Sequence, residues 1–129
     1  MTIGYVTIGA DDVEAAAPFY DAVLGAIGYE RAPMDQAPPG WAFWGVKGGA
    51  PTVGLCRPYD GGAARAGNGI MLAFMAEPAQ IRAAHAAALA NGGRDEGAPG
   101  FRPPEATSDF YAAYVRDAVG NKLCFFNMS

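Results

Sequence analysis

An internal repeat constrains this sequence more than any other feature. The first copy runs from an apolar stretch at 5–9 through an alanine-rich segment to Leu24, and ends at a glycine. The second runs from 70–74 through another alanine-rich segment to Leu89, and also ends at a glycine. The two copies are about half a chain apart. A repeat of this kind sets the plan of the whole fold, so the halves are expected to be equivalent units.

In the first half we expect one strand, one helix and three further strands. Residues 3–9 predict the first strand, and Asp11 followed by Glu14 predicts a capping box at the start of the helix. Pro18 lies inside this helix and predicts a local bend. The other strands are expected at 29–32, 41–46 and 52–57, between turns rich in glycine and proline.

The second half predicts the same order of elements. A strand at 70–75 precedes a helix that begins at Pro78. A short strand and a long loop at 95–108 then lead to two strands joined by a hairpin, at 110–117 and 122–127. The expected buried face of the helix is Ile81, Ala84, Ala88 and Leu89. The order βαβββ twice predicts an α+β fold, with one helix covering each four-stranded sheet.

We therefore expect one domain over residues 1–129. Module one covers about 1–58, the connection 59–68, and module two about 69–129. Hydrophobic residues make up 51% and charged residues 17%, which is typical of globular chains and not of disordered ones.

The net charge limits the classes of partner that the chain is expected to bind, and the cysteine content indicates its cellular compartment. The net charge of −4 argues against nucleic acid and against an anionic membrane surface. No apolar run approaches the roughly 18 residues of a membrane-spanning helix, and the N-terminus does not resemble a signal peptide. Cys56 and Cys124 lie in apolar strand patterns, which predicts two reduced, buried thiols in a cytoplasmic protein.

Several short motifs follow one another in a fixed order. They are Val-Thr-Ile-Gly-Ala at 6–10, Phe-Tyr-Asp-Ala-Val-Leu at 19–24, Leu-Ala-Phe at 72–74, Glu-Gly-Ala-Pro-Gly at 96–100, and Arg-Asp at 116–117 before Gly-Asn-Lys at 120–122. Together they cover nearly the whole chain and resemble the vicinal oxygen chelate superfamily, which includes glyoxalase I, bleomycin-resistance proteins and extradiol dioxygenases. The resemblance implies a cup formed by the two sheets, and a homodimer. In enzymes of the superfamily His, Glu or Gln residues from the first and last strand of each module hold a divalent metal there.

The usual metal ligands are missing from the positions that the resemblance assigns to them. Tyr5 and Met71 stand where histidine is common, and Cys124 stands where glutamate is common. Cys56 is the least certain match, on the fourth strand. A phenol, a thioether and two thiols could bind a soft metal, or they could simply fill an apolar pocket. We predict no metal and no other cofactor, with a divalent metal only if the chain is an enzyme.

Strand alternation assigns the candidate ligand pocket, because successive side chains point to opposite faces. The residues expected to face the cup are Tyr5, Thr7, Cys56, Met71, Ala73, Tyr114, Arg116, Cys124 and Phe126. Trp41 and Phe43 are added as an aromatic wall, although the sequence does not say which face of their strand looks inward. Arg116 beside Lys122 could anchor a carboxylate or phosphate, or could be a solvated strand end.

The sequence does not identify catalytic residues. His85 is the only histidine, and it is expected at the surface or boundary of the second helix, away from the cup. An acid or base in the cup would come from Tyr5, Glu105, Asp109, Tyr111, Tyr114 or a cysteine.

Three functions remain open. The chain could be a metal-independent binder of a small apolar or aromatic molecule, a lyase, isomerase or dioxygenase with unusual ligands, or a dimeric structural or regulatory partner whose cup is filled by its own side chains. The missing ligands favour the first of these.

Overall fold

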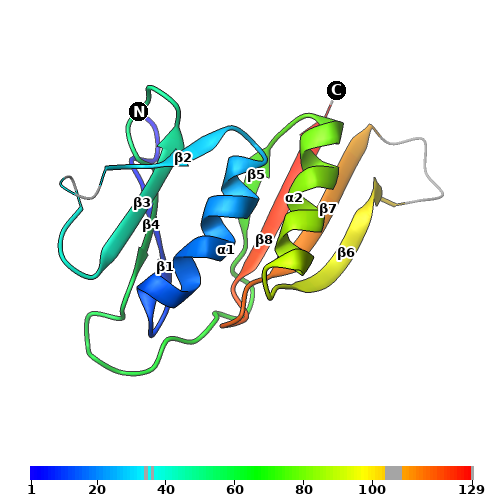
Figure 1. Ribbon diagram of the computed structural model, residues 1–129. Helices are drawn as coiled ribbons and strands as arrows, with labels where there is room; N and C mark the ends of the chain where they lie inside the picture. Colours follow the sequence, from blue (N-terminus) through cyan, green and yellow to red (C-terminus); the bar gives the residue numbers. More distant parts are fainter. Residues whose placement is uncertain (34, 36, 104–108, 129) are drawn as a thin grey trace.

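The computed structural model of the chain describes residues 1–33, 35, 37–103 and 109–128 (Figure 1). The elements of its first half are β1 (Val6–Gly9), α1 (Val13–Gly25), β2 (Tyr29–Arg31), β3 (Trp41–Val46) and β4 (Val53–Cys56). Those of the second half are β5 (Leu72–Met75), α2 (Pro78–Ala90), β6 (Arg94–Phe101), β7 (Phe110–Arg116) and β8 (Lys122–Met128). The order βαβββ therefore occurs twice, as the repeat predicts.

Each half forms a four-stranded mixed sheet. The strand order is β1-β4-β3-β2 in the first sheet and β5-β8-β7-β6 in the second. The first strand of each module runs parallel to its last, while the remaining neighbours are antiparallel. The predicted α+β fold of two four-stranded sheets and two helices is confirmed.

One hydrophobic core joins the two modules. Helix α1 packs against α2, and both lie against the inner faces of the sheets (Figure 1). Trp44 and Leu24 of the first module and Ile81 and Phe125 of the second belong to the same buried cluster. We call the face of each sheet that the helices cover its inner face and the opposite face its outer face. Ligands or partners are therefore to be sought on the outer faces or at the edges of the sheets.

A buried polar contact also crosses between the modules. The hydroxyl of Tyr20 on α1 donates a hydrogen bond to the carboxylate of Asp117, which follows β7. Asp117 Oδ1 also accepts the backbone N–H groups of Val119, Gly120 and Asn121 at 2.8–3.0 Å, and so closes the β7–β8 hairpin. Burial and the adjacent carboxylate raise the pKa of Tyr20 far above its ordinary value, so the phenol stays a donor.

The start of α1 differs from the prediction. Asp12, not Asp11, is the N-cap, and its side chain accepts the backbone N–H of Ala15 at 3.1 Å. The carboxylate of Asp11 instead accepts the backbone N–H of Ala64, 53 positions later, at 2.7 Å. Asp12 therefore caps the helix, and its neighbour Asp11 holds the connection between the modules.

The buried face of α2 is also displaced from the prediction. Leu89 is 45% exposed, whereas His85 is only 8% exposed. His85 faces β6, where its Nε2 lies 2.9 Å from the Asp95 carboxylate. The histidine thus occupies the boundary between α2 and the second sheet, and the helix turns Leu89 toward solvent.

Strand β6 is longer than the short strand expected from its composition. It spans eight residues, although its sequence is rich in glycine. Two register shifts, between Asp95 and Gly97 and between Gly97 and Gly100, accommodate it against β7. Neither described helix is long and apolar enough to cross a membrane.

Candidate functional site

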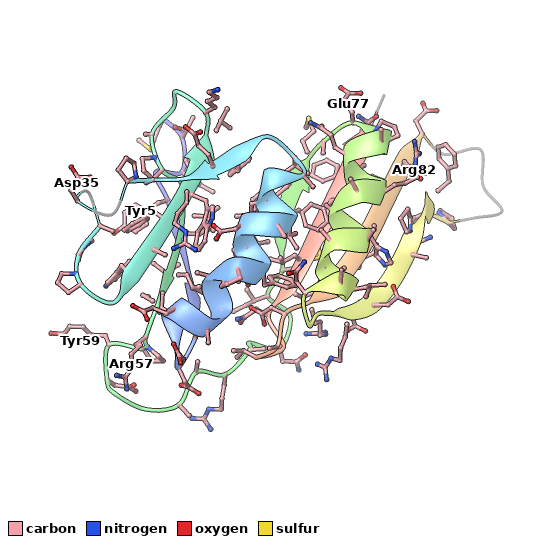
Figure 2. The ribbon with its side chains drawn as sticks, viewed as in Figure 1. Tyr5, Asp35, Arg57, Tyr59, Glu77 and Arg82 are labelled. Carbon is pink, nitrogen blue, oxygen red and sulfur yellow. The ribbon has the colours of Figure 1, made fainter. Side chains whose placement is uncertain are left out.

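The outer face of the first sheet carries a cluster of aromatic side chains. Trp41 and Phe43 stack with ring centroids 5.3 Å apart, and Tyr5 meets Phe43 edge-on at 6.3 Å. Tyr5 lies beside the first sheet (Figure 2). Strand β3 therefore turns Trp41 and Phe43 outward, while Trp44 is buried in the core. Gly54 leaves room for this arrangement, because a Cβ atom there would lie 2.8 Å from the Phe43 ring. Thr7 and Cys56 share this face by strand alternation.

The outer face of the second sheet combines aromatic and basic side chains. Tyr114 pairs with Cys124 across β7 and β8, as counting back from the hairpin predicts. Arg102 and Lys122 each approach the Tyr114 ring, at 5.8 and 5.3 Å from its centroid. Phe126 stacks on a neighbouring ring of β7. Ala73 lies opposite Cys124 on the neighbouring strand, and so belongs to the same face.

Arg116 is engaged within the protein. Its Nε donates to the carboxylate of Glu96, and its Nη1 donates to the backbone carbonyl of Gly120 at 2.8 Å. The hydrogen bond and charge of Arg116 lower the pKa of Glu96. The neighbouring cation, Lys122, forms no ion pair with a described carboxylate.

A groove of about 310 Å³ lies where the two modules meet, and we call it the junction groove. It runs between the edge strands β1 and β5, which do not pair with each other. Its lining is Val6, Thr7, Ile8, Gly9, Arg65, Gly67, Ile70, Met71, Leu72, Asn121, Lys122 and Leu123. Of the predicted pocket residues, Thr7 and Met71 line the junction groove. The others remain on the outer faces of the two sheets or, in the case of Arg116, at the hairpin.

The connection between the modules forms one side of the junction groove. It is pinned by the hydrogen bond between Ala64 and Asp11, and Ala66 packs close to Gly120 of the hairpin. Asn121 Nδ2 donates to the Gly9 carbonyl at 3.1 Å and so links β8 to β1. Sequence reasoning missed Arg65 because the connection has no periodicity to assign a direction to its side chains.

The two thiols do not resemble catalytic nucleophiles. Cys56 and Cys124 are free and buried, as predicted. Burial raises the pKa of both thiols, and the uncharged thiol is a poor nucleophile. Of the candidate acids and bases, Glu105 lies outside the described residues.

The residues present do not fit the divalent metal site that the superfamily's enzymes carry. At the four positions that the resemblance assigns to ligands, Tyr5, Met71, Cys56 and Cys124 supply neither an imidazole nor a carboxylate. Within the described residues, no three His, Cys, Asp or Glu side chains are grouped so that they could hold a metal ion.

Comparisons with known proteins place the chain in a family. The sequence profile of the glyoxalase-like domain matches residues 5–126. A glyoxalase/bleomycin resistance protein from Albidiferax ferrireducens T118 is 39% identical, with 98% of each chain covered and a TM-score of 0.82. No functionally curated protein matches in sequence.

Two more distant structures share the fold. A glyoxalase/bleomycin resistance protein/dioxygenase family enzyme from Burkholderia phytofirmans PsJN is 19% identical over the whole of both chains, with a TM-score of 0.74. A lactoylglutathione lyase from Agrobacterium tumefaciens is 23% identical over 98% of this chain and 92% of that one, with a TM-score of 0.64.

Proposed function

Because this chain belongs to the glyoxalase-like domain family of the vicinal oxygen chelate superfamily, we propose that it binds a small apolar or aromatic molecule without a metal ion. The junction groove carries this proposal. Apolar side chains from β1, β5, β8 and the connection dominate its lining. Its volume is at the lower end of the roughly 300–1,000 Å³ usual for ligand pockets, which suits a small ligand.

The ligand-binding part of the proposal is tested by blocking the junction groove. Replacing Met71 with tryptophan puts a larger side chain into the lining, whereas Met75→Trp makes the same change on β5 outside that lining. The probe is the neutral dye N-phenyl-1-naphthylamine, titrated by fluorescence. Met71→Trp should weaken dye binding about tenfold or more, because the indole would take up volume that the dye needs. Equal affinity in wild type and both variants would place any apolar site elsewhere.

The metal-independent part rests on the donor chemistry of the chain. Met71 and the two thiols, whose pKa burial raises, are poor ligands for hard ions, which prefer carboxylate and other oxygen ligands, and Tyr5 offers only a neutral phenol. The alternative is a metal-dependent lyase, isomerase or dioxygenase. It is favoured by the names of structural relatives, one a lactoylglutathione lyase and another a dioxygenase family enzyme.

Metal analysis separates these two functions. Protein purified without chelator should contain less than about 0.1 equivalent of metal, and excess Ni(II), Mn(II), Fe(II) or Zn(II) should not raise its Tm, because only a ligand that binds the folded state stabilises it. Stoichiometric metal that disappears in Cys56→Ala or Cys124→Ala would contradict metal independence and favour a soft-ligand site.

We also propose that the chain forms a homodimer in the cytoplasm. The outer faces and the edge of β5 expose large apolar side chains, among them Tyr5 at 59% and Met75 at 74%. The two free thiols suit a reducing compartment. Sedimentation velocity should give twice the chain mass, and a monomer mass at every concentration would contradict the dimer.

A further inference from the structure

We propose that the junction groove takes an organic carboxylate, whose charge is held by Arg65 and Lys122 while its apolar body lies along the strands. This inference rests on the proposed function and adds to it the chemical class of the ligand. Four observations carry it: the charge of the lining, the absence of close ion pairs among the described residues, the fixed position of the connection, and the donors that the lining offers.

The lining of the junction groove has a charge opposite to that of the chain. The whole chain has 13 acidic and nine basic residues and a net charge of −4. Among the residues that line the groove, Arg65 and Lys122 are basic and none is acidic. A local excess of positive charge beside apolar side chains favours a ligand that is anionic at one end and apolar at the other.

Neither cation forms a close ion pair among the described residues. The ion pairs there belong to Arg31, His85 and Arg116. Lys122 lies over the Tyr114 ring, and its charge also acts on Glu96, whose own ion pair is with Arg116. Both cations can therefore accept an anion without first breaking an ion pair, so little of the binding energy is lost in rearrangement.

The backbone on either side of the junction groove is held in place. The hydrogen bond from Ala64 to Asp11 fixes the residue before Arg65, and Ala66 packs close to the hairpin glycine. Lys122 begins β8 in regular register with Arg116 of β7. The backbone that carries each cation is therefore fixed before a ligand arrives, which limits the cost of ordering the site.

The donors in the lining suit a carboxylate better than a phosphate. No helix residue lines the junction groove, so it lacks the helix N-terminus on which phosphate sites commonly rely. Both amide hydrogens of Asn121 are already donated, to the Gly9 carbonyl and to Asp117. The remaining side-chain donors are the two cations and the Thr7 hydroxyl, and both cations can donate charge-assisted hydrogen bonds to a carboxylate.

The test compares two probes of the same shape by calorimetry, using the full chain. 4-Phenylbutyrate carries the carboxylate and 4-phenylbutyramide is its neutral counterpart. Wild type should bind the carboxylate about tenfold or more tightly than the amide, since the charge-assisted contacts exist only for the anion. Raising NaCl should weaken binding of the carboxylate and leave the amide unchanged.

Matched variants identify the residues responsible. The double variant Arg65→Gln/Lys122→Gln should lose the preference for the carboxylate while keeping its affinity for the amide within about twofold. The control double variant Arg57→Gln/Lys47→Gln removes the same two charges from exposed positions outside the lining and should behave as wild type. Arg57 directly follows β4, in the loop at the lower left of the view (Figure 2).

The possible failures are distinct. Equal binding of the two probes by wild type, or an unchanged preference in Arg65→Gln/Lys122→Gln, would overturn the carboxylate inference and leave the proposed function standing. Tighter binding of phenyl phosphate than of 4-phenylbutyrate would overturn the choice of carboxylate. Failure of both probes and of the neutral dye would overturn the inference and the proposed function together.

Discussion

Replacing Asp117 with alanine should lower the free energy of unfolding by about 3–5 kcal/mol, because it leaves several buried donors without an acceptor. Asp117 is 5% exposed and accepts hydrogen bonds from the Tyr20 hydroxyl, from three backbone N–H groups of the hairpin, and from the Asn121 side chain. No other described side chain combines a contact between the two modules with closure of a turn in this way. Urea unfolding followed by circular dichroism measures the loss.

Two further variants separate the contributions of Asp117. Tyr20→Phe removes only the hydroxyl donor, so it should cost about 1.5–3 kcal/mol, the range for one hydrogen bond to a charged group. Asp60→Ala is the matched control, because Asp60 accepts a single backbone hydrogen bond, from Gly62, at an exposed site. Its effect should stay within about 0.5 kcal/mol. A loss in Asp117→Ala no larger than that in Asp60→Ala would show that the buried network does not stabilise the fold.

The elements of this fold follow closely from local patterns. The bounds expected for the third strand, 41–46, are those observed, because a run of β-forming residues is closed by glycine and proline on both sides. The pairing of Tyr114 with Cys124 follows from counting outward from a hairpin whose turn is marked by glycine. Both are short-range inferences, in which neighbouring residues settle the outcome.

The sequence-based predictions are wrong where a contact with a residue distant in the sequence selects one of two local possibilities. Asp11 and Asp12 are equally good N-caps in isolation, and the connection selects Asp12 by binding Asp11 through Ala64. His85 and Leu89 are four positions apart on α2, and the Asp95 carboxylate on β6 decides that the histidine is the buried one. Neither contact is visible in local periodicity.

The candidate site was predictable only in part, for the same reason. Alternation assigns side chains to a face, so the grouping of Trp41 with Phe43 and of Tyr114 with Cys124 could be predicted within each sheet. Alternation does not say how two sheets are oriented around their helices. It also says nothing of Arg65, which lies in an aperiodic connection and still lines the junction groove.

The close packing of the two modules at Gly93 predicts a large loss of stability when this glycine is replaced. This glycine precedes β6 and lies at the contact between α1 and the second module. A Cβ atom there would lie 2.7 Å from a ring carbon of Phe19, 2.8 Å from the carbonyl oxygen of Ala88 and 3.0 Å from that of Arg116. Gly93→Ala should therefore lower the free energy of unfolding by about 2–3 kcal/mol, at the upper end of the range for overpacking, because two of the three opposing atoms belong to the backbone.

Gly25→Ala is the matched control for Gly93→Ala. Gly25 closes α1, no heavy atom lies within 4 Å of its added Cβ, and its backbone is helical. The methyl group should raise the free energy of unfolding by about 0.5–1 kcal/mol there, because alanine loses less backbone entropy than glycine in a helix. If urea unfolding shows that the added methyl group lowers the free energy of unfolding at Gly93 and raises it at Gly25, the tight packing lies at the contact between the modules. If the two variants are equally stable, the modules can separate enough to admit a methyl group. The junction groove depends on the same module arrangement, so it would then lack a fixed shape.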